Sequence, residues 1–218
     1  MDVLIAGGHG QVARRLIRLL AGDGHTARGI VRNPDHAPDV EADGGVPVVC
    51  DLEHEDLRPH AGGADAIVFA AGAGAGSGPE RKRTVDLGAA VACVETAEDL
   101  GIARFVIVSS IGAEAPEAGP EPMRPYLRAK AEADARVEAS SLDWTIVRPG
   151  SLHDEPGDRV TVTTDLGARG PVARDAVAHV LLATLLEPGT IRRTFVVIDG
   201  DVPAREAVRN PRPPSDVP

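Results

Sequence analysis

Aromatic side chains and cysteines are both scarce in this sequence. Phe, Trp and Tyr together make up 2% of the 218 residues, so Val, Leu, Ile and Ala must fill the core. The two cysteines, Cys50 and Cys93, lie within apolar segments, which predicts buried thiols in a reducing compartment. No apolar run reaches the ~18–20 residues that a membrane span needs. These absences favour a cytoplasmic protein with no membrane segment.

Positive charge and metal-ligand spacings are also lacking. The net charge is −10 and no basic stripe exists to neutralise phosphates, so we expect no nucleic-acid partner. The start of the chain has no basic leader, which again predicts a cytoplasmic protein. The seven histidines show no His-x-x-x-His spacing and the cysteines no Cys-x-x-Cys, so no metal site is expected. The expected partner is a small-molecule substrate, bound by a monomer or a homodimer.

What the sequence does contain is a regular alternation of strand and helix patterns. Short apolar runs end in glycine or polar residues, and most are followed by a stretch with helical spacing. Strands that alternate with helices pair in parallel through right-handed crossovers, which predicts a Rossmann-type doubly wound, mostly parallel sheet with helices on both faces, in one domain. The expected strands are Val3–Ala6, Ala27–Val31, Val46–Cys50, Ala66–Ala70, Arg104–Val108, Thr145–Val147 and Thr194–Ile198, and the expected helices are Gln11–Leu20, Glu80–Leu100, Arg124–Ser140 and Ala173–Leu186.

Two segments depart from this alternation. Arg159–Asp165 alternates with period two and predicts a small, partly exposed strand. The segment 203–218 holds five of the 18 prolines and little apolar material, which predicts a poorly ordered extension. We therefore expect a dinucleotide-binding domain over residues 1–202, with a small substrate region near residues 150–171, and a proline-rich tail over 203–218.

A glycine-rich turn follows the first strand and opens the first helix. Gly7 permits a sharp turn, Gly10 removes a Cβ where a pyrophosphate would approach the helix N-terminus, and the small Ala13 lets helix and strand pack closely. This context favours a dinucleotide site, although a tight turn without a ligand is the alternative interpretation.

The residue that ends the second strand bears on which dinucleotide binds. An NAD site usually places Asp or Glu there for the ribose 2′-hydroxyl, whereas this strand leads into Arg32. A guanidinium can pair bidentately with a 2′-phosphate, so the sequence favours NADP(H), with NAD(H) or a solvated loop arginine as alternatives. Asp51 ends the third strand in the same way and could accept from an adenine amino group or cap a turn.

Several further motifs occur in order along nearly the whole chain, and together they resemble the atypical short-chain dehydrogenase/reductases. The group in question is the small NAD(P)-binding one that includes NmrA-like proteins and candidate NAD-dependent epimerase/dehydratases. The motifs are Gly-x-x-Gly-x-x-Ala at Gly7–Ala13, Val-Arg-Asn-Pro at Val31–Pro34, Ala-Ala-Gly at Ala70–Gly72, Val-Ser-Ser at Val108–Ser110, Tyr-Leu-x-Ala-Lys at Tyr126–Lys130 and Thr-Ile-Val-Arg-Pro-Gly at Thr145–Gly150.

The resemblance implies where a cofactor would lie. Ala70, Ala71 and Gly72 would pass under its adenosine ribose and pyrophosphate, Pro149, Gly150 and Leu152 would border its nicotinamide, and Lys130 would bond its ribose. The full set of expected cofactor-binding residues is Gly7, Gly10, Gln11, Val12, Arg32, Asp51, Leu52, Ala70, Ala71, Gly72, Lys130, Pro149, Gly150 and Leu152.

The resemblance also implies a catalytic set, made of Ser109 or Ser110 with Tyr126 and Lys130. Tyr126 and Lys130 are four residues apart and would share one helix face, where the ammonium would favour the phenolate. The phenol would donate a proton to a carbonyl oxygen while the cofactor delivers hydride. The family's usual Asn is replaced by Asp86, an acid that could pair with Lys130 and alter the proton route. The alternative is that Tyr126 only packs at the surface.

These residues predict an NADP(H)-dependent oxidoreductase that transfers hydride to a small carbonyl or related acceptor. Two alternatives stay open. One is an NmrA-like redox sensor that binds NADP(H) without turnover, and the other is a flavin- or biliverdin-type reductase that needs no tyrosine acid. A sugar-nucleotide epimerase is disfavoured, because the chain after Gly150 is short for a substrate lobe.

Overall fold

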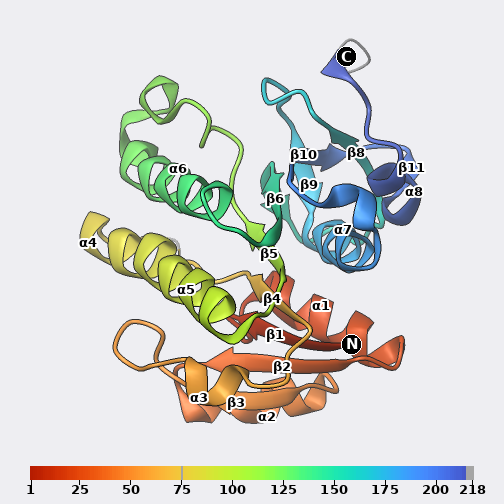
Figure 1. Cartoon of the computed structure of the whole chain (residues 1–218). Helices are drawn as coiled ribbons and strands as arrows, with labels where there is room; N and C mark the ends of the chain where they lie inside the picture. Colours follow the sequence, from red (N-terminus) through yellow and green to blue (C-terminus); the bar gives the residue numbers. More distant parts are fainter. Residues whose placement is uncertain (75, 215–218) are drawn as a thin grey trace.

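The protein folds around a nine-stranded sheet in the order β11-β8-β10-β6-β5-β4-β1-β2-β3 (Figure 1). The computed structural model describes residues 1–74 and 76–214. From β10 to β3 in this order, every pair of neighbouring strands is parallel. Strand β8 runs antiparallel to both of its neighbours, β10 and β11. The strands of this sheet are β1 (Asp2–Ala6), β2 (Thr26–Val31), β3 (Val46–Val49), β4 (Ala66–Phe69), β5 (Arg104–Val108), β6 (Asp143–Pro149), β8 (Arg159–Thr163), β10 (Arg193–Asp199) and β11 (Val202–Pro203), and a separate pair contains β7 (Ser151–His153) and β9 (Pro171–Ala173).

Helices cover both faces of the sheet, which confirms the predicted doubly wound single domain. Alternate residues of β1 point to opposite sides: Val3 and Ile5 join one core cluster, Leu4 and Ala6 the other. The first cluster includes residues of α1 (Gln11–Gly22), α2 (Ala37–Ala42), α7 (Arg174–Leu186) and α8 (Ala204–Arg209), and the second includes residues of α3 (Arg58–Ala61), α5 (Ala90–Leu100) and α6 (Arg124–Glu138). Among the described helices, none is both long and apolar enough to cross a membrane.

The segment predicted as one helix over Glu80–Leu100 contains a change of helix type. Helix α4 (Pro79–Arg81) leads into a π-helical segment, η2 (Lys82–Ala89), which continues as α5. A π segment fits an extra residue into the turn and is common at functional sites. Here its buried residues include Val85 and the carboxylate Asp86.

The strand predicted over Arg159–Asp165 is confirmed as β8 (Arg159–Thr163), but it is more buried than predicted. Arg159 is exposed and Val160 to Thr163 are buried, because β8 lies between β10 and β11 within the sheet. The antiparallel strand β11 covers the edge that would otherwise face solvent.

The prediction of a poorly ordered extension over residues 203–218 is wrong for residues 203–214. Pro203 belongs to β11, and α8 follows it with Ala204, Ala207 and Val208 buried in the core. Three apolar side chains at helical spacing suffice to anchor a six-residue helix against α7 and β8, and Arg212 bridges to Thr163 beyond it. Residues 215–218 lie outside the described part of the chain.

Candidate functional site

A cavity of about 300 Å³ opens at the carboxyl ends of β1, β2 and β4. The strand order reverses between β1 and β4, and the crevice at such a switch point is where doubly wound sheets bind ligands. Eight of the predicted cofactor-binding residues lie around this one cavity, although they come from four separate segments. They are Gly7, Gly10, Arg32, Asp51, Leu52, Ala70, Ala71 and Gly72.

The glycine-rich turn forms the floor of the cavity. Gly7 has a φ of 80°, and a Cβ there would lie 2.7 Å from the Cα of Ala71. Gly10 precedes α1, and its N–H donates to the carbonyl of Gly7 at 2.7 Å. No described side chain caps this helix start, so first-turn N–H groups are available to an anion. A turn in which three of four residues are glycines, beside a helix N-terminus, fits a dinucleotide pyrophosphate.

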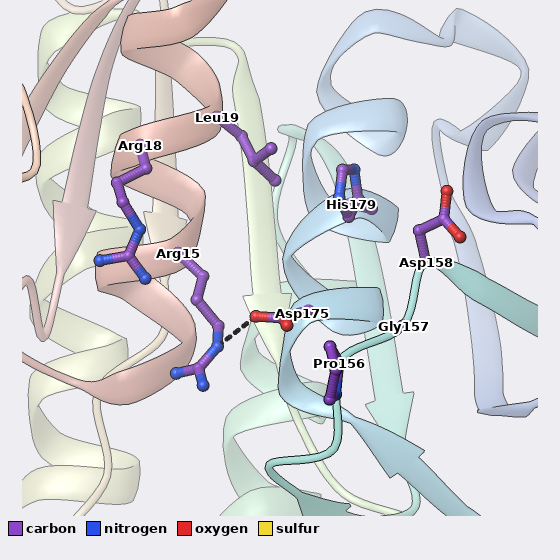
Figure 2. A pocket seen from close by; sticks show the side chains of 8 residues that line it. All are labelled: Arg15, Arg18, Leu19, Pro156, Gly157, Asp158, Asp175 and His179. Carbon is purple, nitrogen blue, oxygen red and sulfur yellow. Dashed lines mark hydrogen bonds and ion pairs between the residues drawn. The ribbon is translucent and has the colours of Figure 1, made fainter.

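A second, larger hollow of about 490 Å³ lies between α1 and α7 (Figure 2), and no predicted site residue is among its described lining residues. Arg15 of α1 donates through Nε to Asp175 of α7 at 2.5 Å across it, and also lies 3.3 Å from Asp154. Charges of both signs therefore pair within this hollow. Asp175 also stands in the first turn of α7, where a carboxylate favours the helix dipole.

Charged side chains gather at one rim of the cavity. Arg32, which follows β2, places Nη1 3.0 Å from the Glu53 carboxylate, and Arg81 of α4 places Nη2 3.6 Å from the same oxygen. Thr84 donates to the other Glu53 oxygen at 2.6 Å. The predicted cation is thus present at the cavity, already paired with an internal anion.

Asp51 contacts its own turn as well as lining the cavity. Its carboxylate accepts from the backbone N–H of Glu53 at 3.1 Å and lies 3.2 Å from Nδ1 of His54. Burial acts to raise the pKa of Asp51, but these hydrogen bonds outweigh it, and the pKa is lowered overall. The sequence left open whether Asp51 contacts an adenine amino group or caps a turn, and the turn-capping contact is present in this structure.

Lys130 and Asp86 form a buried ion pair beside the cavity, as the substitution of Asp for Asn suggested. Nζ of Lys130 lies 3.3 Å from Asp86 Oδ1, and it donates to the carbonyl of Val108 at 3.1 Å. The other Asp86 oxygen accepts the N–H of Ala73 at 3.2 Å, so the acid joins Lys130 to the glycine-rich loop after β4. Tyr126 is half-buried on the same helix, its ring centre 5.8 Å from Nζ.

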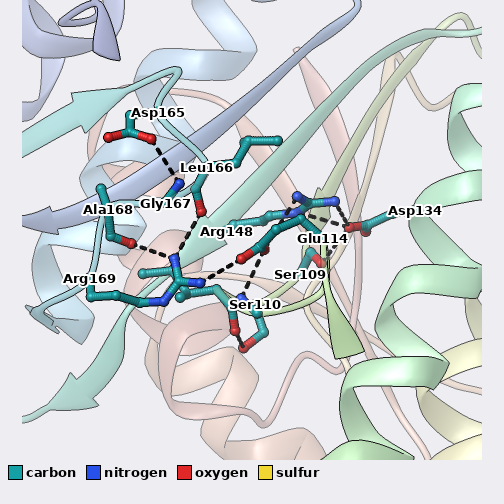
Figure 3. A network of polar contacts seen from close by, with 12 residues as sticks. Ser109, Ser110, Glu114, Asp134, Arg148, Asp165, Leu166, Gly167, Ala168 and Arg169 are labelled. Carbon is teal, nitrogen blue, oxygen red and sulfur yellow. Dashed lines mark hydrogen bonds and ion pairs between the residues drawn. The ribbon is translucent and has the colours of Figure 1, made fainter. Parts of the chain in front are cut away.

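Ser109 belongs to a different polar network, shown in Figure 3. Its hydroxyl donates to the buried Asp134 at 2.8 Å, and Asp134 also accepts from Arg148 at 2.9 Å. Burial raises the pKa of Asp134, while Arg148 and Ser109 oppose that shift. The chain of contacts continues to Glu114, 3.6 Å from Arg148, and on to Arg169 at 2.7 Å. Ser110 instead donates to the carbonyl of Ile111 at 3.1 Å.

The remaining predicted site residues are not among the described residues that line the cavity. Pro149 is buried at the end of β6, Gly150 follows it, and Leu152 is exposed on β7. This group comprises Gln11, Val12, Asp86, Ser109, Ser110, Tyr126, Lys130, Pro149, Gly150 and Leu152.

Sequence reasoning missed several polar residues of the cavity rim. The missed residues with a charged or polar side chain are His9, Asn33, His36, Glu53 and Arg81. Glu53 lies two residues beyond Asp51, at the carboxyl end of a predicted strand, and that position was the available signal. Arg81 had none, because its approach to Glu53 depends on how the loop after β4 returns to the sheet.

Several known proteins match this chain over most of its length. A family model described as NAD(P)H-binding matches residues 7–188. The uncharacterized sugar epimerase YhfK of Bacillus subtilis is 39% identical over 213 residues, covering 96% of this chain and 99% of the relative. A solved Bacillus halodurans protein, named as a candidate NAD-dependent epimerase/dehydratase, is 40% identical with a TM-score of 0.92, covering 95% of this chain and 98% of its own.

A more distant solved structure shows the same fold. A short-chain dehydrogenase/reductase (wide type) of Veillonella parvula in complex with NADP has a TM-score of 0.73 at 17% identity, over 92% of this chain and 95% of its own. Because the family model covers most of the chain and the Bacillus relatives match it nearly end to end, the chain belongs to the NAD(P)H-binding family.

Proposed function

We propose that the protein is an NADP(H)-dependent oxidoreductase that reduces a small carbonyl or related acceptor. The observation that carries this proposal is the cavity at the switch point, which combines the glycine turn with Arg32 where an NAD site would carry an acid. A bound nicotinamide cofactor would supply the hydride.

The residues around the cavity have distinct roles in this proposal. The turn from Gly7 to Gly10 leaves space for a pyrophosphate at the start of α1. Ala70, Ala71 and Gly72 offer small side chains along the cavity wall. The Arg32 guanidinium, half-exposed at the rim, would pair with a 2′-phosphate.

Tyr126 is the proposed proton donor to the substrate oxygen. It shares helix α6 with Lys130, and the buried pair of Lys130 with Asp86 fixes the ammonium below the tyrosine ring. A cation held beside the ring would stabilise the negative charge that develops on the phenol oxygen as the proton leaves. Asp86 would act here as a positioning residue, since it contacts Lys130 and the loop after β4.

A specific observation favours a second candidate, an NADP(H)-binding sensor without turnover. The Ser109 hydroxyl donates its hydrogen bond to Asp134 and the Ser110 hydroxyl donates to the Ile111 carbonyl, so both are engaged away from a substrate carbonyl. With these contacts kept, catalysis by Tyr126 would lack the serine that the family's catalytic set implies.

The test measures cofactor binding and turnover separately. We expect NADPH to bind more tightly than NADH, and Arg32→Ala to remove roughly 1–3 kcal/mol of that preference. Arg83→Ala is the matched control, because Arg83 is exposed and lies outside the lining that the structure describes. Equal dissociation constants for the two cofactors in the unmodified protein would refute the NADP(H) preference. Consumption of NADPH with a panel of carbonyl acceptors supports the enzyme, and tight binding without consumption supports the sensor.

A further inference from the structure

The Glu53 carboxylate lies in a small anion-binding site formed by side chains of the protein itself. It lies between two guanidinium groups, Arg32 at 3.0 Å and Arg81 at 3.6 Å, and accepts the hydroxyl hydrogen bond of Thr84 at 2.6 Å. Its side chain is 14% exposed, whereas those of Arg32 and Arg81 are 52% and 44% exposed. Two separate segments, the turn after β2 with Arg32 and the helix that holds Arg81 and Thr84, thus direct donors at one anionic group on the cavity rim.

We propose that Glu53 is a specificity-determining residue that competes with the cofactor's 2′-phosphate for Arg32 and Arg81. This inference rests on the proposed function, because it concerns the same cavity. A carboxylate that already pairs with both guanidinium groups lowers their attraction for a second anion, and it repels a phosphate placed beside it. Glu53 therefore weakens NADP(H) binding and leaves NAD(H), which lacks the phosphate, nearly unaffected.

The position of Glu53 allows it to yield to a stronger anion. It lies on the turn after β3, where Asp51 caps the backbone N–H of Glu53 itself. That contact fixes the main chain of Glu53 while its side chain keeps its own rotamers. A dianionic phosphate bonds two arginines more strongly than a monoanionic carboxylate does. The preference for NADP(H) predicted from Arg32 is thus set by the balance between Glu53 and the two arginines.

Glu53→Gln tests the inference because it removes the charge and keeps the length of the side chain. We expect it to tighten binding of NADPH and of 2′,5′-ADP about tenfold, while binding of NADH and 5′-AMP stays within twofold. Glu41→Gln is the matched control, since it removes the same charge from an exposed side chain of α2 outside the described cavity lining. Titration calorimetry measures all four ligands with the full chain, without any turnover.

Two further variants separate the outcomes. In an Arg32→Ala, Arg81→Ala background the effect of Glu53→Gln should fall well below tenfold, because the competition for the arginines is gone and only direct repulsion between the carboxylate and the phosphate remains. If Glu53→Gln does not fold, Glu53→Asp withdraws the carboxylate by one methylene and should raise the NADPH-to-NADH affinity ratio in part. A ratio that stays constant or falls in the folded variant overturns the inference. Failure of the unmodified protein to prefer NADPH refutes only the proposed preference, since Glu53→Gln can still raise the ratio.

Discussion

The Lys130 ammonium shows how single residues define the candidate site. Only 3% of the residue is exposed, and a buried charge is costly unless partners surround it. Asp86 and the Val108 carbonyl supply two of these partners, and the faces of Phe69 and Tyr126 lie 5.7 and 5.8 Å away. Lys130 is therefore held in one place, and any influence on Tyr126 acts from a fixed distance.

Tyr126→Phe tests the proton donor. The change keeps the ring and removes the hydroxyl, so NADPH affinity should stay the same while the reduction rate falls about 10²–10⁴-fold. Lys130→Ala should harm both binding and rate, because Lys130 would contact the cofactor ribose and the ring. Steady-state rates and NADPH titrations measure the two quantities. A rate within threefold of the unmodified enzyme in Tyr126→Phe would rule out this mechanism and favour hydride transfer without a tyrosine acid.

Gly10→Val tests whether the cavity holds the pyrophosphate. A Cβ at Gly10 would lie 3.0 Å from the carbonyl oxygen of Gly7, so a valine must extend into the space above the helix start. We expect loss of NADPH binding with the fold retained. Gly22→Val, at the other end of α1, is the control, because its Cβ would meet no described atom within 4 Å. Unchanged NADPH affinity in folded Gly10→Val would place the ligand elsewhere.

Within the site, the sequence predicted the motifs that are made of consecutive residues. It did not predict the contacts between side chains that are distant in the chain. The glycine turn and Arg32 were predicted because each sits directly after an apolar strand. Glu53 and Arg81 escaped because their meeting depends on the loop after β4 and on side-chain conformation. The partner of Ser109 was missed for the same reason, since Asp134 lies 25 residues away on α6.

Elements are joined by ion pairs as well as by the core, and Asp43 is the strongest example. Located at the end of α2, it accepts from Arg14 and Arg18 of α1, each at 2.5 Å, and its side chain is 6% exposed. Burial acts to raise the pKa of Asp43, but the two guanidinium groups outweigh it and lower the pKa. The pair therefore ties α2 to α1 in the ionised state.

Asp43→Asn should destabilise the fold in a pH-dependent way. Because the folded-state pKa is lowered, the stabilisation is complete above the unfolded value of about 3.9 and is lost as pH falls through the folded value. We expect about 2 kcal/mol lower free energy of unfolding at neutral pH, and a difference that shrinks as the pH falls below the unfolded value of about 3.9. Urea denaturation of both proteins at neutral and at acid pH measures this. The exposed Asp23→Asn should show neither effect, and a pH-independent loss in Asp43→Asn would contradict the ion-pair account.

Strands and long helices were predictable because each contains enough residues to show a hydrophobic periodicity. The seven expected strands are all present, with ends that differ by up to two residues. The elements that were missed are short, and their stability comes from tertiary packing rather than from local preference. The π-helical segment η2 could not be predicted either, since its sequence differs little from that of an ordinary α-helix.

At the scale of the whole molecule, two core clusters on opposite faces of one sheet make the protein a single unit. The C-terminal segment completes one of them: α8 contributes Ala204, Ala207 and Val208 to the cluster that also holds α1 and α7. Three prolines between Pro211 and Pro214 concealed this in the sequence, because they suggest a chain without regular structure. Helix α8, which precedes these prolines, supplies the buried side chains that pack against the core.

Val208→Asp tests whether α8 is part of that unit. Val208 is 2% exposed, so the change removes a buried side chain and places an unpaired carboxylate in the core. We expect a loss of about 3 kcal/mol in the free energy of unfolding, still in a single urea transition. Arg205→Asp introduces the same side chain at an exposed position of α8 and should change stability by less than about 0.5 kcal/mol. If the two variants are equally stable, α8 unfolds independently of the core. A loss of stability confined to Val208→Asp, with NADPH affinity retained, would show that the last helix stabilises the whole domain without taking part in NADPH binding.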